Sequence, residues 1–143
     1  MKSNLKKYAN LSLLYFILAM VAGVFYREYT KALGFQGRTA LAFVHGHFLV
    51  LGTLLMLIVL ILAKVFNLDE EKKMKPFLIL HSIGLPLMGA CLFARGIVQV
   101  SGVVLSSGAD HAISGIAGIS HVLVFVAILM LLLSVKNAVS NNH

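Results

Sequence analysis

The chain has 143 residues, of which 59% are hydrophobic and only 12% are charged, and its formal net charge is +7. A soluble domain of this size could not keep so much apolar surface away from water, so an ordinary soluble domain is excluded. The basic residues lie beside long apolar runs, as membrane-flanking charges do, so the positive charge does not indicate nucleic-acid binding. The single cysteine, Cys91, lies inside an apolar run and excludes an internal disulfide.

Four apolar stretches follow one another, over about 8–26, 39–63, 76–98 and 112–135. Each has roughly 19–25 residues, which is enough to cross about 30 Å of hydrocarbon at about 1.5 Å per residue. Backbone groups in lipid must be satisfied internally, which requires helices. The first stretch follows three lysines, as a signal peptide would, but it is too long and lacks a small-x-small cleavage site. The sequence therefore predicts an all-α integral membrane four-helix bundle, with 1–143 as one domain.

The distribution of lysine and arginine predicts the orientation of the four helices. Of the 12 basic residues, eight would lie on one side and four on the other. The larger group contains Lys2, Lys6, Lys7, Lys64, Lys72, Lys73, Lys75 and Lys136, and the smaller contains Arg27, Lys31, Arg38 and Arg95. Both termini and the middle loop should therefore be cytoplasmic, in a protein of the bacterial cell membrane.

The two halves of the chain carry similar patterns. The pattern M-x-A-x-x-F-x-R begins at Met20 and again at Met88, at an offset of 68. The pattern H-x-L-V-x4-L-M-L begins at His47 and again at His121, at an offset of 74. Two halves with the same topology would be related by a pseudo-two-fold axis along the membrane normal, giving a repeat of two helix hairpins.

Histidines inside membrane spans are costly and therefore indicate function. His47 lies about 12 Å below the outer end of its predicted helix, and His121 lies at nearly the same depth. Two imidazoles at one depth on two helices of a bundle are what a bis-histidine haem requires. The haem would be haem b, since no C-x-x-C-H attachment site exists. Arg27 and Arg95, near the outer helix ends, would reach the haem propionates, although ordinary interface anchors would occupy the same positions.

The choice between His45 and His47 stays open at this point. They are two residues apart, about 200° around a helix, so they cannot ligate one iron together. The repeat favours His47, whereas small residues such as Gly46 and Gly52, nearer the His45 face, favour His45. His81 lies roughly 10 Å in depth from the predicted pair and cannot share its iron. The simplest interpretation of His81 is a bond to a neighbouring helix, with a secondary site as the alternative.

Two resemblances accompany these patterns. The segment H-G-H-F-x3-G, from His45 to Gly52, resembles the H-x-H…G pattern of haem–copper oxidase subunit I relatives, in which two histidines of one helix serve two metal centres. That resemblance covers one helix, and without a copper-site histidine cluster it does not imply oxygen reduction. The whole chain resembles a small bacterial four-helix membrane family with no established activity. The resemblance rests on F-Y-R-E at 25–28 and I-S-G-I-A-G at 113–118 before His121.

The expected function is that of a membrane b-type haem-binding protein acting in electron transfer or in small-gas binding or sensing. Its partners would be the lipid bilayer and a quinone or redox partner protein. A homo-oligomer is a further arrangement to consider. One alternative is a cofactor-free small transporter or assembly subunit, and a second is a copper-binding membrane protein. Whether the chain is an enzyme stays open.

Overall fold

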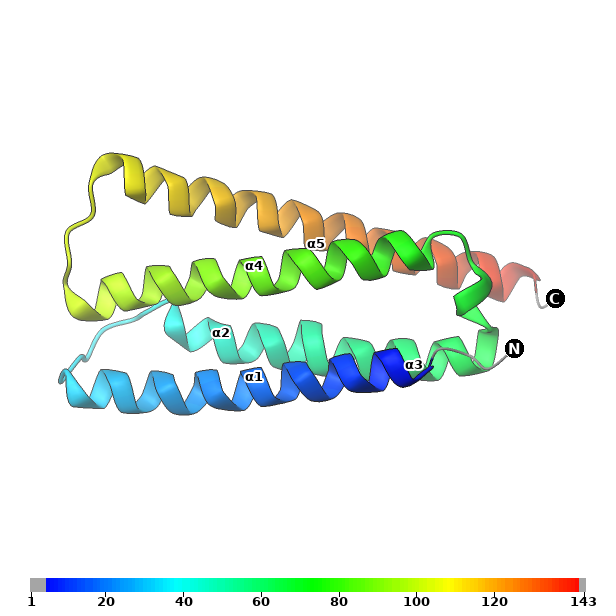
Figure 1. The fold of residues 1–143 in the computed structure, drawn as a ribbon, viewed down its shortest axis with the longest axis horizontal. Coiled ribbons are helices and arrows are strands. Elements are labelled where there is room, and N and C mark those ends of the chain that lie inside the picture. The colour runs from blue at the N-terminus through cyan, green and yellow to red at the C-terminus, as the bar shows by residue number, and fades with distance from the viewer. Residues whose placement is uncertain (1–4, 142–143) are drawn as a thin grey trace.

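The computed structural model describes residues 5–141, and all regular structure within them is helical. The elements in chain order are α1 (Leu5–Ala32), α2 (Leu41–His47), η1 (Phe48–Leu54), α3 (Leu55–Phe66), η2 (Leu68–Glu70), α4 (Met74–Ser101) and α5 (Ser107–Asn141). Because α2, η1 and α3 form one continuous rod, the chain builds four long helical rods (Figure 1). All four are long and apolar enough to span a membrane, which confirms the predicted all-α architecture.

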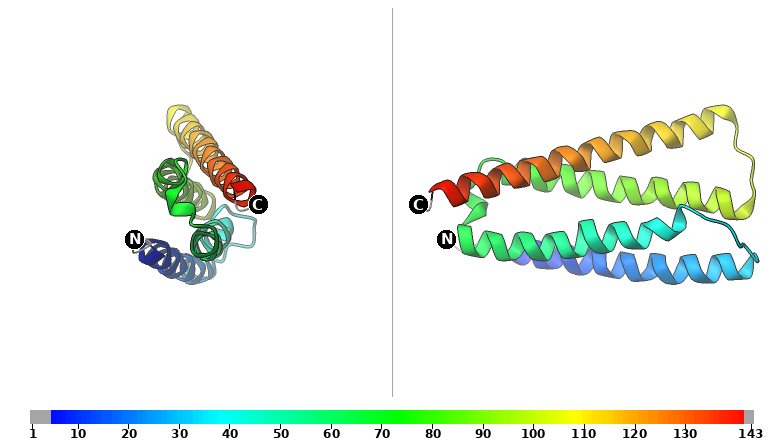
Figure 2. Two further views of the ribbon diagram at one scale, coloured as in Figure 1. Left: turned by 90° about the vertical axis from the view of Figure 1, so that its right-hand side faces the viewer. Right: turned by 180° about the vertical axis from the view of Figure 1, so that it is seen from behind.

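The rods form two antiparallel hairpins (Figure 1). In the first, α1 packs along α2, η1 and α3, and in the second α4 packs along α5. The hairpins meet mainly where α2 contacts α4, and α5 reaches the first hairpin through α3 and η2. We call the end with the 33–40 and 102–106 loops the outer end. There the first part of α5 stands away from α2, as the end-on view in Figure 2 also shows.

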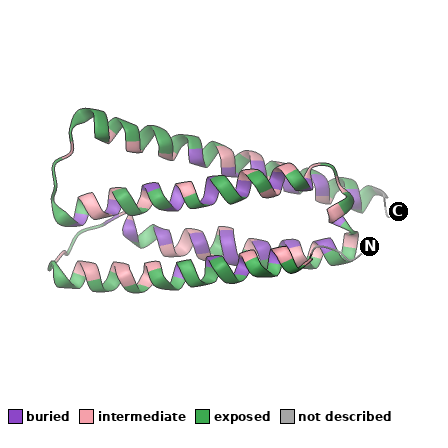
Figure 3. Cartoon of the chain, viewed as in Figure 1, coloured by how far each residue is buried: buried purple, intermediate pink, exposed green. Residues whose placement is uncertain are grey.

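Glycines allow the close approach of helices on which this packing depends. A Cβ added to Gly96 of α4 would overlap Leu41, and one added to Gly89 would overlap the ring of Phe48. In the first hairpin, Gly52 meets Tyr15 of α1 in the same way. The helix faces away from these contacts expose large apolar side chains. Figure 3 marks exposed positions in green along each rod. Such faces are suited to lipid.

The seven-residue π-helix η1 begins directly after His47. Two of its carbonyls accept hydrogen bonds from other helices: Leu51 from His81 Nε2 of α4 at 2.8 Å, and Thr53 from the Ser12 hydroxyl of α1 at 3.1 Å. π-Helical segments are rare and concentrate at functional sites. No hydrophobic pattern predicted this segment, because its residues are apolar except for Thr53 and are typical of an ordinary membrane helix.

The helices are longer than the apolar stretches that predicted them. Arg27 lies inside α1, and the outer loop between α4 and α5 covers 102–106 rather than 99–111. Hydropathy reports only the part in hydrocarbon, whereas helical hydrogen bonding continues into the polar interface. α4 ends at Gly102, whose φ of 70° lies in the left-handed region that glycine adopts without strain. The predicted 12 Å depth of His47 is shortened by the later start of α2 at Leu41.

Candidate functional site

Two of the four intramembrane histidines join neighbouring helices. His45 donates from Nδ1 to the carbonyl of Ala19 in α1, at 2.7 Å, and its ring lies against Gly23 of the same helix. His81, which is fully buried, donates from Nε2 to Leu51. His45 therefore faces the α1 interface, where Gly52 also packs, whereas Gly46 meets no neighbouring helix. His81 bonds a neighbouring helix, as the simplest interpretation of its position in the sequence predicted.

The other two histidines, His47 and His121, share a different arrangement. Each ring places Nδ1 close to the carbonyl four residues earlier on its own helix, at 2.8 Å from Phe43 and at 2.7 Å from Ala117. A carbonyl only accepts, so Nδ1 carries the hydrogen and the Nε2 of a neutral ring keeps its lone pair. No hydrogen bond to either Nε2 occurs within residues 5–141. Metal-ligating histidines are commonly oriented in this way by a carbonyl.

Contacts along α4 give the relative depth of this pair. On the first hairpin, Leu41 lies against Gly96 and Phe48 lies against Gly89, so His47 is level with Ala90. On α5, Ser114 bonds Arg95, and Val124 lies against Gly84. Interpolation between those two contacts puts His121 level with about residues 86–88 of α4. At about 1.5 Å per residue, the two histidines differ in depth by roughly 3–6 Å.

Open space lies beside both histidines. A Cβ added to Gly46, beside His47, would meet no atom within 4 Å, and the same holds at Gly118, which shares the His121 side of α5. A hollow of about 310 Å³ is lined by Gly46, His47, Val50 and Leu51. Within residues 5–141, no hydrogen bond joins the two rings and no three histidine, cysteine or acidic side chains gather as a metal site. The structure thus brings the pair to similar depths but not into contact.

The two arginines lie at the outer ends of α1 and α4 and differ in what they bind. The guanidinium of Arg95 forms an ion pair with Asp110 and donates to the Ser114 hydroxyl at 2.8 Å. Arg27 is exposed, and its nearest carboxylate is Glu28 at 3.8 Å. Arg95 is therefore shared with Asp110, a partner that sequence reasoning missed. The available signal was that Asp110 is the only acidic residue after Glu71.

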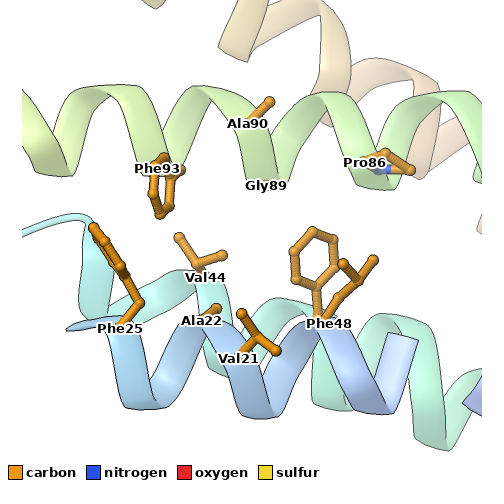
Figure 4. Close-up of a pocket in the computed structure, with 10 residues that line it drawn as sticks. Val21, Ala22, Phe25, Val44, Phe48, Pro86, Gly89, Ala90 and Phe93 are labelled. Carbon is orange, nitrogen blue, oxygen red and sulfur yellow. The ribbon is translucent and has the colours of Figure 1, made fainter. Parts of the chain in front are cut away.

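An apolar cavity of about 430 Å³ lies between α1 and α4, at the depth of the histidine pair (Figure 4). We call it the interhairpin cavity. Its lining is Leu18, Val21, Ala22 and Phe25 of α1, Pro86, Gly89, Ala90 and Phe93 of α4, with Val44 and Phe48. The positions of the four α4 residues equal those of the four α1 residues plus 68, which is the offset of the repeat. The rings of Phe25 and Phe93 also touch, with centroids 5.0 Å apart. The repeat predicted equivalent residues but not that they would line a common cavity.

A chain of four apolar helices long enough to span a membrane, with histidines within them, defines a multi-pass helical membrane protein. A family model described as a protein of unknown function (DUF2871) matches residues 5–138. The chain belongs to that family, in agreement with the four-helix family that it was found to resemble. No curated protein and no solved structure matches it. The haem–copper oxidase resemblance of the 45–52 segment therefore receives no support.

Proposed function

We propose that the protein is a membrane b-type haem protein with His47 and His121 as axial ligands. The observation that carries this proposal is the pair of imidazoles at similar depth, each with Nδ1 bound to a carbonyl of its own helix and Nε2 left without a partner. His45 is bonded to α1, which favours His47 as the ligand on this rod. Two axial histidines leave no open coordination position, so electron transfer is favoured over gas binding.

The surroundings of the pair suit a planar ring. Gly46 and Gly118 leave free volume on the two helices, and α2 and α5 do not pack closely against each other. The propionates would point to the outer end, where Arg27 and Arg95 lie. Arg27 is the freer cation, since Arg95 already pairs with Asp110. An outer-face haem, with both termini cytoplasmic, would exchange electrons with a quinone or a redox partner protein.

The proposal can be tested by filling the free volume rather than by removing ligands. Gly46→Leu and Gly118→Leu each place a side chain in open space, so the fold should persist while haem is excluded. Gly115→Leu is the matched control, because it also lies in open space but about 120° around α5 from His121. We expect purified protein from haem-replete cells to show a low-spin haem spectrum, which the first two variants lose and the control keeps.

The same samples distinguish the two alternatives. Metal analysis that finds copper instead of iron would favour a copper site at the histidines. Colourless wild-type protein without either metal would favour a cofactor-free transporter or assembly subunit. Haem binding that is insensitive to Gly46→Leu and Gly118→Leu would contradict this location of the site.

A further inference from the structure

The walls of the interhairpin cavity contain no group that could recognise a polar ligand. Its lining side chains are alanine, valine, leucine, proline and phenylalanine, with one glycine. An apolar cavity of about 150 Å³ stays dry and binds small hydrocarbons, because water needs two or more polar partners to enter. At about 430 Å³ the interhairpin cavity is larger still, so hydrocarbon rather than water is its natural occupant.

The cavity is open towards lipid. Val44 of α2 and Phe48 of η1 close one side of the cavity. The backbones of α1 and α4 are not closely packed, and the two helices approach each other at the Phe25–Phe93 ring contact (Figure 4). Lining residues are accordingly reachable from outside, with Val21 62% exposed. The contact between Phe25 and Phe93 lies at the outer end of the cavity. A ligand would therefore enter from the side, at the depth of lipid chains.

We propose that the interhairpin cavity binds one hydrocarbon chain of a membrane lipid, either a fatty acyl chain or an isoprenoid chain. A polar headgroup is disfavoured inside, because burying it without hydrogen-bond partners is costly. The chain lies between equivalent faces of the two repeats and so bridges the hairpins beside the Phe25–Phe93 contact, where the backbones of α1 and α4 are not closely packed. This inference does not depend on haem binding, because no histidine lines the cavity.

Photolabelling in nanodiscs tests the proposal. One phospholipid probe carries a diazirine in its acyl chain, and a second probe carries it in an isoprenoid chain. After illumination, mass spectrometry should find label concentrated at 18–25 and 86–93, above that on Ile119 and Val122 of α5, which are exposed and lie at about the same depth. A preference for either probe supports the proposal and identifies the source of the chain.

Variants distinguish binding in the cavity from general contact with lipid. Ala22→Leu with Ala90→Leu fills the cavity and should reduce this labelling by at least about tenfold, since one methylene alone is worth about that in an apolar pocket. Ala94→Leu, an exposed position outside the cavity, is the control and should change nothing. Phe93→Ala enlarges the cavity and should increase labelling. An effect in this direction cannot come from misfolding of the double variant, whose helix content is checked by circular dichroism.

Two results would overturn the inference. One is labelling at 18–25 and 86–93 that equals labelling of α5 and is unaffected by the filling substitutions in protein of unchanged helix content. The other is crosslinking of cavity residues to a second copy of the chain in place of lipid.

Discussion

His81 of α4 donates a hydrogen bond to the carbonyl of Leu51, 2.8 Å away in the π-helical segment of the other hairpin. The bond lies in the fully buried interior, where the second ring nitrogen, Nδ1, has no partner among the described residues. The rings of Tyr15 and Phe77 pack against the imidazole, each with its centroid 5.7 Å away. His81 thus fastens the two hairpins beside the segment that follows His47.

His81→Ala should destabilise the protein and keep its haem. The substitution leaves the Leu51 carbonyl buried without a donor, which costs about 1–3 kcal/mol, and it adds the cost of a cavity. His81→Gln retains a donor and should recover part of the loss. Thermal unfolding in detergent and the haem-to-protein ratio are the two measurements. Complete loss of haem in His81→Ala would mean that the ligand pairing is wrong.

One haem per chain is the expected stoichiometry. A second haem would need His45 and His81, yet both donate to carbonyls of neighbouring helices. His45 and His81 also lie near the starts of their helices, and these starts are at opposite ends of the bundle. Quantitative haem analysis against amino-acid analysis should give a ratio close to one. A ratio near two would show that these interhelical bonds are broken in the haem-bound protein.

Arg95→Leu should impair haem retention more than Arg27→Leu does. Arg95 holds the start of α5 to the end of α4 through Asp110 and Ser114, whereas Arg27 is exposed. Loss of Arg95 should therefore loosen the helix that carries His121, and Arg95→Lys should rescue only partly because lysine lacks the planar fork. Asp110→Asn combined with Arg95→Leu should add little to the single change. Additive effects, or equal effects of the two arginines, would contradict this role.

The loop at 102–106 should lie outside the cytoplasm. Val104 is 93% exposed, and the native Cys91 is buried, so Val104→Cys introduces a readily labelled thiol over a low background. A membrane-impermeant maleimide added to intact cells should label Val104→Cys and should not label the control Lys72→Cys in the opposite loop. Labelling of Lys72→Cys alone would reverse the orientation and move the proposed haem to the cytoplasmic face.

The sequence predicted the four helices because long apolar runs admit little else in a membrane. It also predicted nearly equal depths for His47 and His121, since rise per residue converts numbering into depth, and the contacts along α4 put them roughly 3–6 Å apart in depth. It could not choose between His45 and His47, because that choice depends on which face of the rod meets α1. The π-helix, the Arg95–Asp110 pair and the interhairpin cavity depend on contacts between helices, which hydropathy does not encode.

Absorption spectroscopy of four histidine variants tests the central claim most directly. His47→Ala and His121→Ala should each lose the haem or convert it from low-spin to high-spin, because each removes one axial ligand. His45→Gln should keep the low-spin spectrum, since glutamine can still donate to Ala19, and His111→Ala, at the exposed start of α5, should be unchanged. Wild-type protein without a Soret band, or a low-spin spectrum that survives in both His47→Ala and His121→Ala, would contradict the account.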